Sequence, residues 1–102
     1  MVCSDGLKPD PISKLCESNN ATVSTDTCEF SKDKGASELK TVWVDEEYDP
    51  NIETFYYVRV LENPTCRWST WDAIKNNYEP RQGIDEIIQE RAWSSPIWIN
   101  SN

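Results

Sequence analysis

A chain of 102 residues with 37% hydrophobic and 27% charged side chains has the size and composition of a single globular domain with a modest core. Its net charge of -8 and its pI near 4.4 exclude sequence-independent binding to nucleic acids or to anionic membranes, because both need lysine and arginine facing phosphate. The apolar runs are all much shorter than the roughly 20 residues of a membrane-spanning helix, so we expect no insertion into a membrane.

Residues 1–35 are expected to form an irregular, cysteine-bearing arm. Ser, Asn, Asp, Lys, Thr and Pro dominate this part of the chain, and its apolar residues are scattered without a period. Residues 36–102 are patterned differently and are expected to form a β-rich domain. We expect the two parts to make one structural unit.

The four cysteines, Cys3, Cys16, Cys28 and Cys66, lie in polar, turn-rich surroundings without a histidine or a Cys-x-x-Cys pair, which argues against zinc. An even number of cysteines in a small, weakly cored domain favours two disulfides, and three connectivities are possible. We prefer Cys16 with Cys28, which closes a local loop, and Cys3 with Cys66, which ties the arm to the strands. Free thiols in a reducing compartment are the alternative.

A period of two begins at Glu38 and predicts a strand over residues 38–44, with Leu39, Thr41 and Trp43 on one side. The strand ends in residues 45–51, which contain four carboxylates and suggest either a calcium loop or a solvated turn. The spacing does not match an EF-hand and the glycine of such a loop is missing, so we favour a turn.

Residues 54–62 are rich in aromatic and β-branched side chains and predict a second strand. Apolar side chains fall on both of its faces, which indicates a central strand. Because proline cannot donate to a ladder, Asn63-Pro64 is expected to end it.

A short amphipathic helix is expected next. Residues 69–72 resemble a capping box, Trp71, Ile74 and Tyr78 follow at helical spacing, and Pro80 stops the pattern.

Three isoleucines, at positions 84, 87 and 88, fit either a second helical turn or the start of a strand. Residues 91–99 predict a strand that Pro96 divides into two pieces. The expected fold is therefore mainly β with minor α: a small antiparallel sheet or partial sandwich with an irregular N-terminal arm and a short helix between the last strands.

Two long, aromatic-rich segments, Phe55–Ser69 and Gln89–Trp98, resemble the C-terminal signature of a bacterial family known as domain of unknown function 3604. Residues 35–39 and 42–43 are also similar to that family, so the resemblance covers nearly the whole chain. Members are several times longer, are generally exported, and carry histidine motifs that resemble metal-dependent phosphoesterases of the polymerase-and-histidinol-phosphatase type. The resemblance implies a periplasmic or secreted location, neighbouring terminal strands, and an insertion over residues 63–89.

No catalytic residue is expected in this chain. It contains no histidine, which removes Ser-His-Asp and Cys-His systems and every histidine-based metal centre. The carboxylates within residues 45–53 fit surface charge better than an acid–base pair. Cys66 lies beside Arg67, which would lower the pKa of a free thiol, but a disulfide is favoured over an activated thiolate. We expect no metal and no cofactor.

Two functions remain. The first is a non-catalytic accessory domain whose partner is the remainder of its own parent polypeptide, a metal-dependent hydrolase-like protein. The second is a carbohydrate- or protein-binding module that uses Trp68, Trp71 and Tyr78 as an exposed aromatic surface. The competing interpretation places these three side chains in a small satellite core under the insertion.

Overall fold

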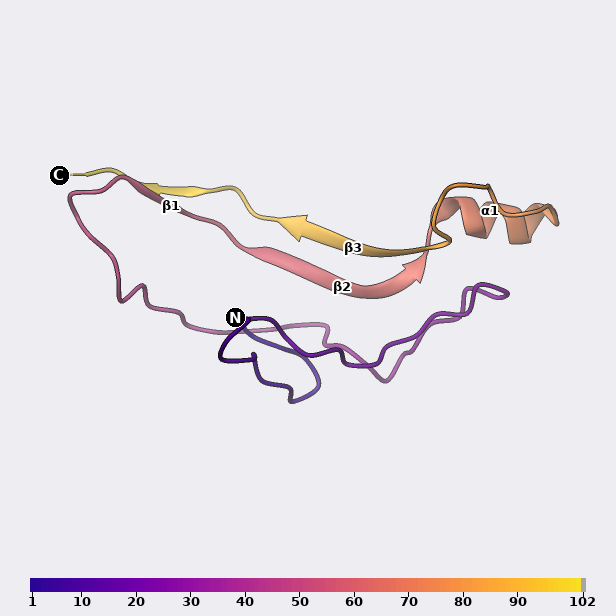
Figure 1. The fold of residues 1–102 in the computed structure, drawn as a ribbon, viewed down its shortest axis with the longest axis horizontal. Helices are drawn as coiled ribbons and strands as arrows, with labels where there is room; N and C mark the ends of the chain where they lie inside the picture. Colours follow the sequence, from indigo (N-terminus) through magenta and orange to yellow (C-terminus); the bar gives the residue numbers. More distant parts are fainter. Residues whose placement is uncertain (102) are drawn as a thin grey trace.

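The computed structural model describes residues 1–101. Its principal extents are 61 × 28 × 23 Å, and its radius of gyration is 18.6 Å, whereas a compact domain of ~100 residues has about 13 Å. A long ribbon of strands runs along the molecule with a helix at one end, and the irregular N-terminal part lies alongside it (Figure 1). The chain is therefore extended and has little volume for an interior.

The ribbon consists of two successive two-stranded antiparallel sheets. Strand β1 (Thr54–Tyr56) pairs with β4 (Ile97–Ile99), and β2 (Arg59–Cys66) pairs with β3 (Ile87–Trp93). The two aromatic segments are thus neighbours, as the resemblance implied. A mainly β fold with one short helix is confirmed.

The segment predicted as a single central strand over residues 54–62 is wrong in two respects. The structure divides it into β1 and β2, each with one partner, so neither is a central strand. Strand β2 also continues through Asn63-Pro64 to Cys66, because a register shift between Leu61 and Pro64 accommodates the proline. Proline is tolerated at such an irregularity, where no ladder N–H is needed.

The predicted break at Pro96 is confirmed. Strand β3 ends at Trp93 and β4 begins at Ile97. Between them the Ser94 N–H donates to the Val58 carbonyl at 2.9 Å, and the Val58 N–H donates to Ser94 Oγ at 2.8 Å. The serine side chain thus joins the two sheets where the ladder is interrupted. For the isoleucines at positions 87 and 88, the strand is confirmed and the helical turn is wrong, because both residues lie in β3.

The strand predicted over residues 38–44 is absent, and that prediction is wrong. No strand of residues 1–101 pairs with this segment, so its backbone joins no ladder. Val42 is 92% exposed and Val44 is 72% exposed. Alternation alone does not make a strand when no partner is present.

Helix α1 (Trp68–Asn76) confirms the predicted helix but not its capping box. The N-cap is Arg67, which makes no side-chain capping bond, and Thr70 lies inside the helix, where its Oγ1 donates to the Glu86 carbonyl at 2.8 Å. The helix ends at Asn76 and does not reach Pro80, and its C-cap residue Asn77 is in the left-handed conformation with φ 55°. Asparagine is one of the residues that take this conformation readily.

Residues 1–35 fold into two tight turns of the same design and contain no helix or longer strand. The first is closed by a bridge between Pro9 and Cys16, the second by a bridge between Val23 and Phe30. The residue five positions after the first bridge residue has a positive φ in each turn: Lys14, five after Pro9, and Cys28, five after Val23, both have a φ of 58°.

All four cysteines form disulfides, but the preferred pairing is wrong. The bonds are Cys3–Cys16 and Cys28–Cys66. The first turn folds back onto the start of the chain and brings Cys16 to Cys3, while the tip of the second turn reaches the end of β2 and brings Cys28 to Cys66. Two disulfides indicate an oxidising environment.

The interior is restricted to the region where α1, the end of β2 and the second turn meet. The buried residues within residues 1–101, each at most 8% exposed, are Cys28, Cys66, Ser69, Thr70 and Ala73. By contrast, all five tryptophans of the sequence are more than half exposed. The side chains that normally fill a core are on the surface.

Candidate functional site

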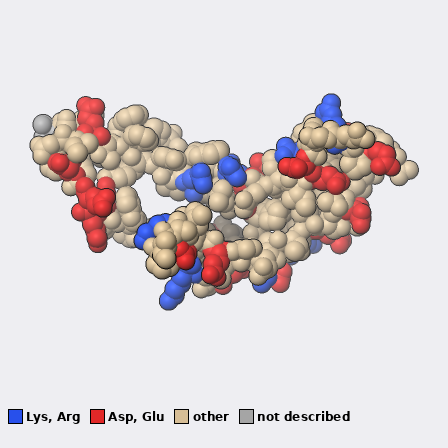
Figure 2. All heavy atoms as spheres, in the orientation of Figure 1, with Lys and Arg blue, Asp and Glu red and all other residues tan. Residues whose placement is uncertain are grey.

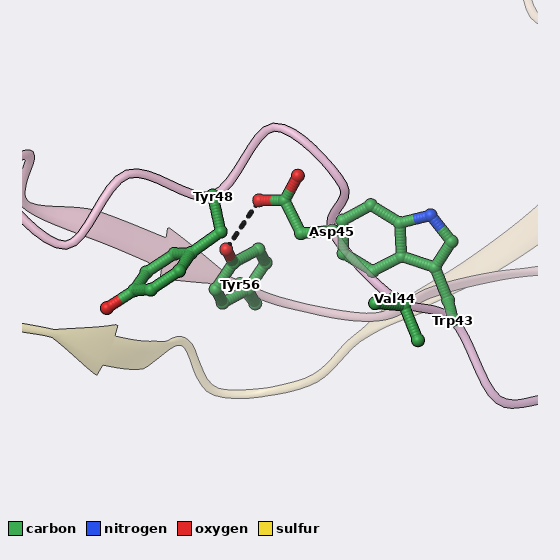
Figure 3. Close-up of a pocket in the computed structure, with 5 residues that line it drawn as sticks. All are labelled: Trp43, Val44, Asp45, Tyr48 and Tyr56. Atoms are coloured by element: carbon green, nitrogen blue, oxygen red, sulfur yellow. Dashed lines mark hydrogen bonds between the residues drawn. The ribbon is translucent and has the colours of Figure 1, made fainter.

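The end of the ribbon farthest from α1 carries a shallow, open hollow lined by Trp43, Val44, Asp45, Tyr48 and Tyr56 (Figure 3). Tyr56 comes from β1, and the other four lie on the loop that precedes it. The Trp43 ring meets the Tyr56 ring edge-on, with centroids 5.8 Å apart and an interplanar angle of 64°. The loop thereby covers one face of β1.

A hydrogen bond between two side chains joins the loop to β1 in this hollow. The Tyr56 hydroxyl donates to Asp45 Oδ2 at 2.6 Å (Figure 3). This bond, followed by desolvation and by the charge of Asp45, raises the pKa of Tyr56 to about 12. Tyr56 therefore remains a protonated donor at neutral pH and cannot serve as a base there.

The loop does not cover the opposite face of the β1–β4 sheet. Phe55 and Trp98 are directly paired across β1 and β4, with ring centroids 5.0 Å apart, and Tyr57 stacks on Phe55 at 6.3 Å. Phe55 is 50% exposed, Tyr57 53% and Trp98 66%. We call these three side chains the uncovered aromatic face. Sequence reasoning assigned these strands to a core and missed this surface, although aromatic residues on both sides of a short strand were the available signal.

This end of the molecule is also acidic. Residues 41–58 contain five carboxylates and no lysine or arginine: Asp45, Glu46, Glu47, Asp49 and Glu53. Figure 2 shows acidic atoms and no basic ones at this end, on the visible face.

The carboxylates here belong to turns. Asp45 Oδ1 accepts the Glu47 N–H at 3.1 Å, and Asp49 Oδ1 accepts the Asn51 N–H at 2.9 Å. Within residues 1–101 no cluster of His, Cys, Asp or Glu is placed to hold a metal ion. The arrangement fits the predicted solvated turn.

The predicted aromatic surface lies at the other end of the molecule. Trp68 and Trp71 lie one turn apart on α1 and are 67% and 52% exposed, on the side away from the buried Ser69 and Ala73. Tyr78 follows the helix and is 50% exposed. These side chains do not form the satellite core considered above.

Tyr78 is held by its own helix. Its hydroxyl donates to an Asp72 carboxylate oxygen, and this bond, with a smaller contribution from desolvation, raises the pKa of Tyr78. The contact fixes the tyrosine beside the C-terminus of α1.

A cluster of polar groups joins the N-terminal residues 1–35 to the ribbon. Asp5 accepts the Gly35 N–H at 2.9 Å and Asn19 Nδ2 at 3.1 Å, and the same Asn19 nitrogen donates to Asn63 Oδ1 at 2.9 Å. The Ser4 hydroxyl, and then the Gly35 N–H, lower the pKa of the Asp5 carboxyl. All these groups satisfy one another, so the cluster has a structural role.

Cys66 is in a disulfide, so the thiolate considered for it does not exist. Within residues 1–101 no helix is both long enough and apolar enough to cross a bilayer.

Comparison with known proteins identifies the family. A family model described as a protein of unknown function (DUF3604) matches residues 1–101. The chain belongs to this family. No curated protein and no solved structure matches the DUF3604 chain significantly. The resemblance drawn from the two aromatic segments is thus confirmed, while the more distant similarity to metal-dependent phosphoesterases remains a prediction.

Proposed function

We propose that this DUF3604 chain is a non-catalytic accessory domain that packs against the remainder of a larger exported, metal-dependent hydrolase-like protein. The observation that supports this role is the missing interior. Among residues 1–101 only three hydrophobic residues, Cys28, Cys66 and Ala73, are buried, whereas every tryptophan is more than half exposed.

The physical reason is that such a surface is unstable in water. Soluble monomers rarely expose contiguous apolar patches of more than a few hundred Å². A two-stranded ribbon is also marginally stable alone and needs a further strand or a packed layer. Packing against a larger protein body supplies that layer for the β1–β4 and β2–β3 sheets. The oxidising environment indicated by the two disulfides supports a periplasmic or secreted location.

Two measurements on the purified 102-residue chain test this role. The first is binding of a dye that reports exposed apolar surface, for which we expect a strong signal under conditions in which both disulfides are intact. The second is hydrolysis of phosphoesters with divalent metal, for which we expect none. Metal-dependent hydrolysis by this chain alone, or the absence of dye binding, would contradict the proposal.

A second candidate function is supported by the exposure of Trp68 and Trp71, which present two indole rings on one side of α1 with Tyr78 nearby. Exposed rings of this kind stack on sugars or anchor a protein partner. Oligosaccharides should then shift tryptophan fluorescence in the wild type and in Trp93→Ala, a matched exposed control on β3, but not in Trp68→Ala or Trp71→Ala. No response across a glycan panel would reject the carbohydrate version.

A further inference from the structure

The hollow beside β1 combines three aromatic rings with one carboxylate. Its lining residues are Trp43, Val44, Asp45, Tyr48 and Tyr56, and its volume is near 410 Å³, which lies within the roughly 300–1,000 Å³ of small-ligand sites. Successive side chains of a strand point to opposite sides, so the hollow and the uncovered aromatic face lie on different sides of β1. The hollow is therefore a separate site.

The rings of this hollow form a corner and not a flat platform. Trp43 and Tyr56 meet at an interplanar angle of 64° with centroids 5.8 Å apart. Figure 3 shows Trp43 and Tyr48 on either side of the hydrogen bond between Asp45 and Tyr56. Trp43 is 63% exposed and Tyr48 44%, so a ligand can reach both rings. Such a corner suits a compact, rounded group better than a flat one.

The lining carries one negative charge and no positive one, because Asp45 is its single charged residue. Asp45 Oδ2 accepts the Tyr56 hydroxyl at 2.6 Å, and Oδ1 accepts the Glu47 N–H at 3.1 Å. The first of these bonds persists at neutral pH, since the pKa of Tyr56 is raised to about 12. The carboxylate is thus held in place before any ligand arrives, which lowers the cost of binding a cation.

We propose that this hollow binds a quaternary ammonium group, with the rings of Trp43, Tyr48 and Tyr56 around its methyl groups and the Asp45 carboxylate supplying the opposite charge. A cation within about 6 Å of a ring centroid is attracted by the ring, and quaternary ammonium groups are recognised by sets of aromatic rings. Their methyl groups also cover apolar lining such as Val44. This inference goes beyond the packing role proposed above and does not depend on it.

The same contacts argue against other ligands. A primary ammonium is a compact and strongly hydrated charge, so it loses more hydration on entering an aromatic site. A sugar needs several hydrogen-bond partners, but both Asp45 oxygens and the Tyr56 hydroxyl already bond within the chain. An anion is repelled by Asp45.

The test is an NMR titration of the full chain, with both disulfides intact and the ionic strength held constant. Choline is the probe, and we expect saturable shifts at the Trp43 indole and at the amides of residues 43–48 and 54–56. The matched ligand is the neutral carbon analogue of choline, in which a tert-butyl group replaces the trimethylammonium group. It should bind at least about fivefold more weakly, because it has the same shape and no charge.

A second pair of ligands separates two sources of the same group. A short peptide that contains trimethyllysine should bind more tightly than the same peptide with unmodified lysine. Tighter binding of choline than of the methylated peptide assigns the site to a small molecule, and the reverse order assigns it to a methylated protein.

Variants locate the site. Trp43→Ala should weaken choline binding about fivefold, and Asp45→Asn, which keeps the size of the side chain, should weaken it by about the same factor. Asp49→Asn is the matched control, because Asp49 lies on the same loop but does not line the hollow. This control should bind as the wild type does. Unchanged signals from β2 and β3 establish that a variant keeps its fold, and the comparison of ligands needs no variant.

Equal binding of choline and its carbon analogue would overturn the proposal, as would full affinity in Trp43→Ala or in Asp45→Asn. Shifts centred on α1, or an equal loss of affinity in Asp49→Asn, would also overturn it. So would the absence of binding. None of these results bears on the packing role, which dye binding and the hydrolysis assay decide.

Discussion

The Cys28–Cys66 disulfide is predicted to be the main covalent support of the fold. It closes a loop with a sequence separation of 38, and Cys3–Cys16 closes one of 13. In the chain-entropy account these closures stabilise the folded state by about 4 and about 3 kcal/mol respectively. Cys28 and Cys66 are 3% and 7% exposed, so replacing them also removes contacts from the small interior.

The perturbation is a comparison of two double variants, Cys28→Ala with Cys66→Ala and Cys3→Ala with Cys16→Ala. Urea unfolding followed by far-UV circular dichroism measures the free energy of unfolding. Because domains have only about 5–15 kcal/mol of net stability, loss of the first bond should leave the chain largely unfolded at room temperature. Loss of the second should lower stability measurably and loosen mainly residues 2–16.

A larger loss of stability in the Cys3→Ala with Cys16→Ala variant would refute this reasoning. Peptide mapping under non-reducing conditions is the independent check. A fragment that joins Cys16 to Cys28 would contradict the observed connectivity directly.

Three further predictions concern single positions. Gly35→Ala should lower the free energy of unfolding by about 2 kcal/mol, because φ is 88° and a Cβ there would lie 2.8 Å from Asn63 Nδ2; thermal unfolding measures it, and an unchanged midpoint would contradict it. Asp45→Asn should lower the pKa of Tyr56 from about 12 toward its ordinary value. In a pH titration, the absorbance of the tyrosinate should then appear at a lower pH than in the wild type. Because the pKa of Tyr56 is raised in the folded state, its stabilising contribution is complete below pH ~10 and is lost as the pH rises through about 12. Lys14→Gly should stabilise the first turn by about 1 kcal/mol, because Lys14 has a φ of 58°; a fall in the unfolding midpoint would refute this.

Local patterns predicted the parts of the fold that depend on near neighbours. The spacing of Trp71 and Ile74 identified the helix, and Pro96 identified the break between β3 and β4. Both features arise within a few residues, so sequence alone contains the necessary information. The pairing of the two aromatic segments came from the family resemblance, because the paired residues lie between 21 positions apart (Cys66 with Ile87) and 45 (Thr54 with Ile99) and have no periodic relation.

The wrong predictions all depend on what lies beside a segment in space. The pairing of Cys28 with Cys66 depends on where a turn tip reaches, which spacing along the chain does not specify. Residues 38–44 alternate as a strand does, yet no strand pairs with them within residues 1–101. Pro64 was expected to end β2, but a register shift at that point lets the pairing continue.

The location of the candidate surface was unpredictable for the same reason. Phe55 and Trp98 have the composition of a core, and the sequence indicates only that they are apolar and belong to strands. Whether such residues are buried depends on what covers them, and within residues 1–101 Phe55 stays 50% and Trp98 66% exposed. A pattern of apolar residues on both faces therefore indicated the need for burial without showing the partner.

Hydrogen exchange at the backbone amides of β1 and β4 tests the central claim most directly. The measurement compares the isolated 102-residue chain with the same residues in the larger protein. If the ribbon obtains its stability by packing on that protein, these amides exchange rapidly in the isolated chain and become strongly protected in the larger one. Equal and strong protection in both would show that the chain is stable alone and would contradict the account.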